Sequence, residues 1–550
     1  MPDHKRVLII GGVAGGASCA ARLRRLDEDA EIIIFERGPH VSFANCGLPY
    51  YVGKVIKEEG DLLVATPEMF NRNFRIEIRA RNEVSAIDRE KQEIEVKNLE
   101  TGETYRERYD ALVLAPGAAP LRPPIPGIGL PGIHILRTIP DSNAIKAWIR
   151  ERNPKRAVVV GGGYIGLEMT ENLVRRGLDV TIVEMLPQIM PALDPEMAEA
   201  VTQHLESKRV NVETGDGVAA FEQAAGGSLL VKTRRGAAYP ADLVILSVGV
   251  RPETALARSA GLECGECGGI RVDEMMRASD PRIWAVGDAV ETRDIVTGQW
   301  VLAPLAGPAN RQGRIAAEVI AGRDSRFRGV QMTSICGVLG LTVAATGASE
   351  KRLRAAGITN YRKVYVHPGH TAMYYPGSKR LNLKVIFRED DGRILGAQCV
   401  GENGVDKRID VLALAIQHGA TVYDLEEAEL CYAPQYGAAK DPVNIAGMVA
   451  ANILRGDLPQ ADWSKLEETD AVLVDVRNPE EYRSDHIDGA INIPLGEMRE
   501  RYTELPKDRE IWINCAIGQR AYYAARFLLQ KGYKVKHLSG GLITYWGYYS

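Results

Sequence analysis

Cysteine is scarce in this sequence of 550 residues, with eight scattered along the chain. Such sparse cysteines do not form a disulfide scaffold, so a reducing compartment is the simpler context. Long apolar runs are also missing: stretches such as 7–10 and 157–160 have strand length, far short of the roughly 20 residues that span a bilayer. We therefore expect a cytoplasmic protein without a membrane segment. Because residues 1–6 lead directly into a strand, we expect no signal peptide.

An excess of positive charge is absent as well. The chain has 68 basic and 72 acidic side chains and a formal net charge of −4, so no basic field predicts a nucleic-acid partner. What is present is an ordinary globular composition, 45% hydrophobic and 25% charged. A chain of this length exceeds a single core, and we expect roughly three or four domains.

The N-terminal segment has the pattern of a dinucleotide-binding β-α-β unit. A strand at 6–10 precedes a glycine-rich turn, a helix follows through Leu26, and a second strand at 31–35 ends at Glu36. Glu36 lies about 20 residues after the last glycine, the spacing at which an acid reaches a nucleotide ribose. The motif is imperfect, because Val13 replaces its middle glycine. The predicted cofactor-binding residues here are Gly11, Gly12, Gly15, Gly16, Glu36 and Arg37.

A second unit of the same kind follows the predicted strand at 156–160. It matches G-x-G-x-x-G in full, at Gly161, Gly163 and Gly166. Glycines at these places let the backbone approach a pyrophosphate at a helix N-terminus. The next strand leads to Glu184, which can accept hydrogen bonds from a ribose and would repel a 2′-phosphate. We therefore expect NADH as the second cofactor, with NADPH still possible.

A third segment carries the adjacent pair Gly287 and Asp288. Two nested dinucleotide units followed by a late Gly-Asp pair resemble the pyridine nucleotide–disulfide oxidoreductases, over residues 1 to about 450. The resemblance implies that the first unit binds FAD, that the second binds the nicotinamide cofactor and that Asp288 contacts the FAD ribitol. It also implies a homodimer formed through a third domain.

Cys46 lies in the segment SFANCG, shortly after Glu36. Many disulfide reductases of this family carry a second cysteine five positions later, where this chain has Tyr51. A lone thiolate beside a flavin can still attack a disulfide or persulfide and form a mixed disulfide, which the reduced flavin then cleaves. The segment resembles that of coenzyme A–disulfide reductases and of related NADH oxidases and polysulfide reductases.

That resemblance implies that two tyrosines, by position Tyr374 and Tyr432, reach the cysteine of the other subunit. A phenol can hydrogen-bond a sulfur or a leaving thiolate, and interface packing is the alternative role.

Coenzyme A carries phosphate charges, so its site needs cations. Arg22 and Arg25 share one face of the first helix. The resemblance implies a coenzyme A site built from Ser18, Arg22, Arg25, Ser42, Asn45 and Lys440.

The C-terminal region has motifs of its own. Residues 475–482 and 486–494 resemble the paired signatures of the rhodanese fold. A predicted strand at 511–514 ends at Cys515, and a helix follows the next few residues. A short loop in this position wraps backbone N–H groups around the sulfur and stabilises a thiolate or a persulfide.

Arg520 closes this loop of six residues. Ala516 and Ile517 lack the cation that would favour thiosulfate, so we expect a persulfide or polysulfane as the donor to Cys515.

Elsewhere, Cys264 and Cys267 form a lone C-x-x-C pair. A zinc site would need two more ligands nearby, so we read a surface loop and predict no metal site.

The predicted fold class is α/β, with two nested Rossmann-like dinucleotide-binding domains, an α+β dimerisation domain and a C-terminal rhodanese α/β domain. The expected boundaries are 1–115 with 250–325 for the FAD domain, 116–249 for the NAD(P)H domain, 330–452 for the dimerisation domain, 453–464 for a linker and 465–550 for the rhodanese domain.

These patterns predict an enzyme that passes hydride from NADH to FAD and then reduces a sulfur adduct on Cys46, with Cys515 as a sulfane-sulfur carrier. The expected substrates are coenzyme A disulfide, coenzyme A persulfide or polysulfide. One alternative is an NADH oxidase in which Cys46 cycles through a sulfenic acid. Another is a sulfur-carrier protein with a flavin redox-sensor module. The rhodanese motifs argue against the first, and the complete cofactor motifs argue against the second.

Overall fold

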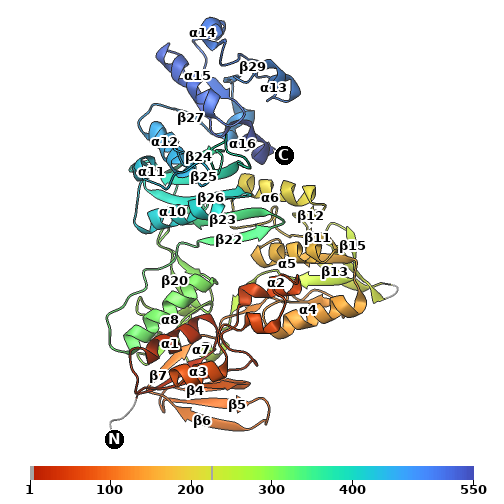
Figure 1. Ribbon diagram of the computed structural model, residues 1–550, viewed down its shortest axis with the longest axis vertical. Coiled ribbons are helices and arrows are strands. Elements are labelled where there is room, and N and C mark those ends of the chain that lie inside the picture. The colour runs from red at the N-terminus through yellow and green to blue at the C-terminus, as the bar shows by residue number, and fades with distance from the viewer. Residues whose placement is uncertain (1–4, 225–226, 550) are drawn as a thin grey trace. The chain divides into compact units, whose positions relative to one another are not determined.

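The computed structural model describes residues 5–224 and 227–549. The chain divides into two compact units, Met1–Pro187 with Arg209–Met332 and Gln188–Lys208 with Thr333–Ser550 (Figure 1). Helices alternate with the strands of two parallel sheets in the first unit, and both units mix helices with strands, which confirms the predicted α/β class. Within the described residues, no helix is both long enough and apolar enough to cross a membrane.

The first unit contains a parallel sheet that begins at the N-terminus. Its strands, in spatial order, are β19 (Ile283–Ala285), β7 (Ala111–Leu114), β1 (Arg6–Ile10), β2 (Glu31–Glu36) and β3 (Glu77–Ala80). The central strand β1 is almost wholly buried, as expected for a parallel sheet covered by helices. Helix α1 (Ala14–Arg24) packs closely against α8 (Ala306–Ile320). The carboxyl ends of β1, β2 and β19 therefore bring the first glycine-rich turn, Glu36 and the Gly287–Asp288 pair to one edge of the sheet.

A second parallel sheet repeats this arrangement. Its strands, in order, are β12 (Asn211–Glu213), β11 (Asp179–Val183), β10 (Arg156–Val160), β16 (Leu243–Leu246) and β9 (Ile133–His134). Helix α5 (Tyr164–Arg175) follows β10, and the short α2 (Leu48–Val52) packs against both α5 and α4 (Ile139–Arg152). The segment after Cys46 thus joins the two dinucleotide folds.

Smaller sheets complete the first unit, and most of their strands are antiparallel. They are built from β4 (Asn82–Asp88), β5 (Glu93–Asn98) and β6 (Thr104–Arg108); from β13 (Val218–Gln223), β14 (Leu229–Thr233) and β15 (Ala238–Ala241); from β8 (Ala118–Pro120) and β17 (Val250–Pro252); and from β18 (Ile270–Arg271), β20 (Val290–Arg293) and β21 (Trp300–Leu302). The remaining helices of this unit are α3 (Pro67–Phe74) and α7 (Ala255–Ser259).

The second unit begins with an antiparallel sheet. Its strands, in order, are β22 (Ser334–Val338), β23 (Leu341–Gly347), β26 (Ile394–Gly401), β25 (Leu381–Arg388) and β24 (Tyr361–Val366). Its helices are α9 (Glu350–Ala355), α10 (Val405–Gln417), α11 (Val422–Glu427) and α12 (Pro442–Leu454). Helix α6 (Pro195–Ser207) also belongs to this unit, although its sequence lies between β11 and β12 of the first.

A five-stranded parallel sheet ends the chain within the same unit. Its strands, in order, are β27 (Gln460–Ala461), β31 (Val535–Leu538), β30 (Ile511–Asn514), β28 (Val472–Asp475) and β29 (Ile491–Asn492). Its helices are α13 (Pro479–Ser484), α14 (Met498–Arg501), α15 (Gln519–Gln530) and α16 (Gly541–Tyr549). Strand β27 lies in the stretch that the sequence suggests as a linker, and its pairing with β31 draws that stretch into the sheet.

Candidate functional site

The first glycine-rich turn brings the backbone into close contact with a neighbouring strand end. Gly11 has a φ of +96°, and a Cβ at this position would lie 2.1 Å from the carbonyl oxygen of Ala115. At Gly16, a Cβ would lie 1.9 Å from the carbonyl oxygen of Gly11. Because a side chain would clash with the backbone at each of these two positions, only glycine fits there. The turn therefore seats the N-terminus of α1 at the sheet edge, where helix N–H groups favour an anion.

The acid at the end of β2 lies over this turn. Glu36 accepts hydrogen bonds from the N–H of Gly12 at 3.0 Å and of Gly38 at 2.7 Å. The two N–H groups fix the carboxylate beside the turn, and its contact with a ribose stays a prediction. The guanidinium of Arg37 pairs with Glu253 at 2.6 Å and also interacts electrostatically with Glu36.

The second turn repeats this geometry with different neighbours. Glu184, almost fully buried, accepts hydrogen bonds from the N–H of Gly162 at 2.7 Å and of Leu186 at 2.8 Å. A Cβ added at Gly163 would meet nothing within 4 Å. The glycine therefore leaves open space beside the helix N-terminus, as a close-approaching pyrophosphate needs. The residues at both turns fit a bound dinucleotide.

The late Gly-Asp pair follows β19. The N–H of Gly287 donates to Oε1 of Gln312 on α8 at 2.7 Å, which fixes the turn against that helix. Burial raises the pKa of the Asp288 carboxyl, and Arg137 acts in the opposite direction. A partly desolvated carboxyl group benefits from hydroxyl donors, which the ribitol chain of FAD offers. The residue present therefore fits the cofactor that the sequence suggests.

Cys46 lies in a single 3₁₀ turn, Asn45–Gly47, directly before α2. Its thiol is free and exposed. Desolvation by the surrounding protein raises the pKa of this thiol, and the carboxylates of Glu168 and Asp288 raise it further. Cys46 and the late Asp288 are therefore close enough to interact electrostatically. Ser42, at a φ of +46°, donates its N–H to the carbonyl oxygen of Gly12 at 2.8 Å, which ties this segment to the first turn.

Glu168 is a residue that sequence reasoning missed. It lies on α5, and its carboxyl group hydrogen-bonds with Tyr50 on α2. Burial and the neighbouring Glu171 raise the pKa of Glu168 to about 7, although the Tyr50 hydrogen bond lowers it. A carboxyl group that titrates near neutral pH beside a reactive thiol is a candidate functional group. No local pattern in the sequence indicates its place near Cys46, because that place follows from the packing of α5 against α2.

The residues expected to bind coenzyme A have different environments. Ser18 hydrogen-bonds with Asn310. Arg22 forms an ion pair with Glu318 on α8, with 2.5 Å between Nη2 and Oε1. Arg25 and Asn45 are exposed in the first unit, and Lys440 is exposed in the second, just before α12. The pairing of Arg22 leaves Arg25 and Lys440 as the more accessible cations of the set.

Two exposed tyrosines meet in the second unit. The hydroxyl groups of Tyr374 and Tyr432 are 3.3 Å apart, and the side chains are 74% and 51% exposed. This hydrogen bond raises the pKa of Tyr374. Exposed aromatic side chains also include Tyr375 and Tyr436 in the same two loops. Exposed aromatic side chains in two neighbouring loops are typical of an interaction surface.

Cys515 is fully buried at the end of β30. Arg520, in the first turn of α15, lies beside it and makes two bonds to the carboxylate of Glu481, at 2.6 and 2.7 Å. The Arg520 guanidinium holds the pKa of Glu481 at about 2. The fixed arginine can stabilise negative charge on the sulfur. At the C-x-x-C pair, burial raises the pKa of both Cys264 and Cys267 most, and Glu291 raises both further, whereas Arg258 lowers that of Cys264 and Arg271 lowers that of Cys267.

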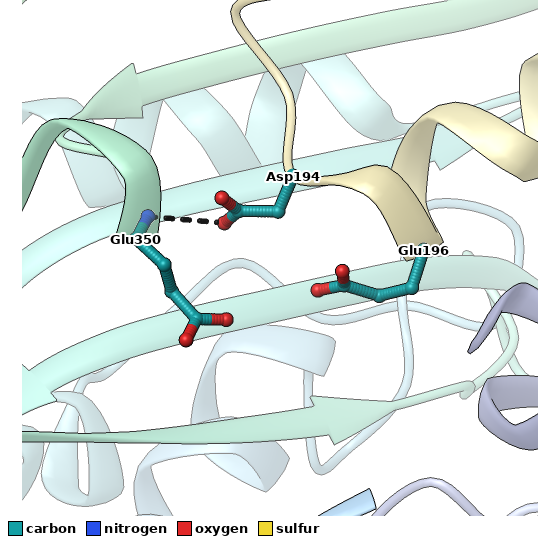
Figure 2. A group of neighbouring side chains, drawn as sticks. All are labelled: Asp194, Glu196 and Glu350. Atoms are coloured by element: carbon teal, nitrogen blue, oxygen red, sulfur yellow. Dashed lines mark hydrogen bonds between the residues drawn. The ribbon is translucent and has the colours of Figure 1, made fainter. Parts of the chain in front are cut away.

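A cluster of three buried carboxylates lies in the second unit. Figure 2 shows Asp194 and Glu196 at the start of α6 facing Glu350 of α9. The ammonium group of Lys384 already lies among them, 2.7 Å from Asp194, 2.6 Å from Glu350 and hydrogen-bonded to Glu196. A lysine therefore supplies the positive charge that a metal ion would otherwise bring.

Comparison with known families places most of the chain. Residues 5–313 match the family model described as pyridine nucleotide-disulphide oxidoreductase, residues 333–441 match the dimerisation domain of that family, and residues 459–546 match a rhodanese-like domain. A coenzyme A disulfide reductase from Staphylococcus haemolyticus is 34% identical over 452 residues, 82% of this chain and 100% of the relative. An NADH oxidase from Methanocaldococcus jannaschii is 36% identical over 448 residues, 80% of this chain and 97% of the relative.

Two solved structures are similar over nearly the whole chain. Reduced CoADR-RHD from Bacillus anthracis is 48% identical, with a TM-score of 0.97 over 99% of this chain and 98% of that one. An NAD-dependent persulfide reductase from A. fulgidus is 39% identical, with a TM-score of 0.92 over 98% of this chain and 100% of that one. Their coverage includes the C-terminal parallel sheet as well as the two dinucleotide folds.

Proposed function

Because the chain belongs to the pyridine nucleotide-disulphide oxidoreductase family, we propose that it uses NADH and FAD to reduce coenzyme A disulfide or a persulfide of coenzyme A. Polysulfide is a further substrate of the same chemical class. One observation carries the proposal: an exposed thiol, Cys46, in the segment tied to the first glycine-rich turn, shares a chain with a buried cysteine, Cys515, in the rhodanese-like domain. Similar proteins are a coenzyme A disulfide reductase and a persulfide reductase.

The residues at each turn support one cofactor apiece. FAD would lie on the turn of Gly11, with Glu36 and Asp288 as acceptors for its ribose and ribitol hydroxyls. NADH would lie on the turn of Gly163, with Glu184 accepting from its ribose. Because Glu184 is held in place by two N–H groups and nearly buried, a 2′-phosphate would meet a fixed negative charge. We expect NADH to be the better donor on this ground.

Cys46 forms and releases the sulfur adduct. Its thiolate attacks the disulfide or persulfide, and the outer sulfur leaves as a thiolate or as hydrosulfide. When bound, FAD supplies the electron pair, taken from NADH, that breaks the remaining sulfur–sulfur bond. Tyr374 and Tyr432 are proton donors for the leaving thiolate. Because each subunit would place these tyrosines beside Cys46 of its partner, this role requires a dimer. A homodimer formed through residues 333–441 is therefore part of the proposal.

Coenzyme A recognition rests on cations that remain accessible. Arg25 and Lys440 are exposed, and Arg22 would share its guanidinium between Glu318 and a phosphate. Ser18, Ser42 and Asn45 complete the proposed set as polar contacts. The sulfur chemistry of both cysteines needs reduced thiols, so a reducing cytoplasm is the proposed compartment.

The direct test is anaerobic reoxidation of the NADH-reduced enzyme by coenzyme A disulfide, by coenzyme A persulfide and by polysulfide, with oxygen as the fourth acceptor. We expect the sulfur acceptors to restore the oxidised flavin spectrum rapidly. Cys46→Ser should still be reduced by NADH, because hydride transfer does not need the thiol, yet should lose reoxidation by coenzyme A disulfide.

Two results would contradict the proposal. Rapid reoxidation by oxygen with slow reaction of all sulfur acceptors would instead identify an NADH oxidase, as in the relative from Methanocaldococcus jannaschii. Undiminished disulfide reduction by Cys46→Ser would remove this cysteine from the reaction.

A further inference from the structure

We propose that the C-terminal helix α16 acts as a strut: it holds the loop of residues 515–520, here called the sulfur loop, in a fixed position relative to the antiparallel sheet. Tyr548 is the positioning residue that anchors this strut to the sheet. The inference rests on the proposed role of Cys515 as a sulfane-sulfur carrier. It is supported at three points along α16, each with its own contacts.

The first turn of α16 holds the backbone of the sulfur loop. The N–H of Leu542 donates to the carbonyl oxygen of Cys515 at 2.9 Å, and the N–H of Ile543 donates to that of Ala516 at 3.2 Å. The approach is so close that a Cβ at Gly541 would lie 2.1 Å from the Cys515 oxygen. These N–H groups belong to the helix end, where no intrahelical acceptor exists.

This contact fixes the direction of the loop's donors. In a trans peptide, the carbonyl and the N–H of one peptide unit point in opposite directions. Holding the carbonyls of Cys515 and Ala516 against α16 therefore turns the following N–H groups, those of Ala516 and Ile517, away from the helix. Since such N–H groups stabilise a thiolate or persulfide, the orientation of α16 bears on the reactivity of Cys515.

The middle of α16 is bonded to the antiparallel sheet. The hydroxyl of Thr544 lies 2.9 Å from Nε2 of His367, at the end of β24, and Nδ1 of the same ring lies 2.8 Å from Oδ1 of Asn382 on β25. Burial lowers the pKa of His367 to about 4, so the ring is neutral at physiological pH. A neutral ring that donates to Asn382 must accept from Thr544, which gives this contact a defined direction.

The last turn of α16 reaches the buried charges. Tyr548 accepts a hydrogen bond from Lys363 at 2.9 Å and lies 2.7 Å from the hydroxyl of Tyr365. Tyr365 in turn donates to Glu196, one of the three carboxylates around Lys384. The chain Lys363, Tyr548, Tyr365 and Glu196 thus runs donor to acceptor without a break.

The buried cluster makes this anchor rigid. Burial opposes ionisation of Glu350, yet Lys384 and Lys363 together lower its pKa to about 2, so the cluster stays charged at physiological pH. Buried charges tolerate few geometries, because displacing one leaves another without its counterion. Tyr548 is the contact of α16 with this cluster that a single hydroxyl deletion can remove.

Tyr548→Phe tests the strut with little change in volume. Two readouts are compared: the pH profile of Cys515 alkylation by iodoacetamide, followed by peptide mass spectrometry, and the rate of coenzyme A disulfide reduction at Cys46. We expect alkylation and persulfide turnover to slow by roughly threefold to tenfold, as for the loss of one hydrogen bond, with the alkylation profile moved to higher pH. Coenzyme A disulfide reduction should keep the wild-type rate.

Two further variants complete the design. Tyr545→Phe removes a hydroxyl from the same helix at a ring that packs against Trp463 in a tilted arrangement, and should match the wild type. Thr544→Val removes the middle contact and should change Cys515 in the same direction as Tyr548→Phe. A wild-type alkylation profile in both Tyr548→Phe and Thr544→Val would overturn the strut, as would an equal loss of both activities in Tyr548→Phe.

The alkylation assay also separates this inference from the proposed function. It reports the state of the Cys515 thiol whether or not the enzyme turns over a persulfide. A shifted profile in Tyr548→Phe together with no persulfide turnover in the wild type would support the strut and reject the carrier role.

Discussion

At the scale of single residues, burial raises the pKa of the Cys46 thiol most, and acids from other elements raise it further. Cys46 follows β2 in the sequence, whereas Glu168 comes from α5 and Asp288 from the turn after β19. Negative charge disfavours a thiolate, so in the protein alone both acids keep Cys46 protonated to higher pH. Reactivity of this cysteine therefore depends on what neutralises or displaces those charges.

Glu168→Gln should move the pH profile of Cys46 alkylation to lower pH. Glu168 titrates at about 7, so it is charged in the alkaline range where the thiol ionises, and its negative charge raises the thiol pKa. Removing that charge should lower the apparent thiol pKa by up to about one unit. Alkylation rates of the purified protein between neutral and alkaline pH measure the shift. An unchanged profile would show that burial and Asp288, and not Glu168, raise the thiol pKa.

The sequence predicts the turn residues well and their partners poorly. Gly11, Glu36 and Glu184 follow from local spacing, because a strand, a tight turn and a helix N-terminus are all encoded within a few dozen residues. Arg22 illustrates the opposite case. Its ion pair with Glu318 joins residues far apart in the chain, and no local pattern indicates that α1 and α8 pack together. Glu168 was missed for the same reason, since its importance comes from its place beside Cys46.

At the scale of elements, α6 and α9 face each other with their acidic N-terminal ends. Asp194, Glu196 and Glu350 (Figure 2) would repel one another, and Lys384 of β25 makes the arrangement stable. None of these residues stands out in the sequence, because charged side chains are most often on the surface. Their burial follows only from the packing of α6 into the second unit.

Glu350→Gln should flatten the acid dependence of stability. The pKa of Glu350 is lowered from 4.5 to about 2 in the folded protein. A lowered carboxyl pKa contributes stability that is present above 4.5 and is lost as the pH falls towards 2. Wild-type thermal unfolding temperatures should therefore drop over this range more steeply than those of the variant. Glu389→Gln, which alters an exposed pair with Arg362, is the control and should follow the wild type.

At the scale of the whole molecule, one chain holds a pyridine nucleotide-disulphide oxidoreductase part and a rhodanese-like domain. Cys46 lies in the first unit and Cys515 in the second, and under the proposed function a sulfane sulfur held on Cys515 would be passed to Cys46. Coenzyme A, with a thiol at the end of a flexible arm, is a carrier of suitable chemistry. Covalent fusion raises the local concentration of each site for the other.

Cys515→Ser should separate the two substrate classes. Reduction of persulfide or polysulfide donors should slow, because their sulfur enters through Cys515, whereas coenzyme A disulfide reaches Cys46 directly and should react at a near-normal rate. Steady-state rates for both substrates on one enzyme preparation make the comparison. Equal loss of both activities would assign the C-terminal sheet a structural role, and no loss of either would show that the domains act independently.

The route of the chain through α6 has a consequence for synthesis on the ribosome. This helix is translated between β11 and β12 of the second parallel sheet. The antiparallel sheet on which it packs, through β23 and β26, emerges more than a hundred residues later. Until then its apolar side chains, Met197, Val201 and Leu205 among them, have no permanent cover. In a shortened protein that ends at Met332, the apolar face of α6 would stay exposed permanently. Expression of the flavin-binding half alone therefore calls for replacing Gln188–Lys208 rather than for a simple stop codon.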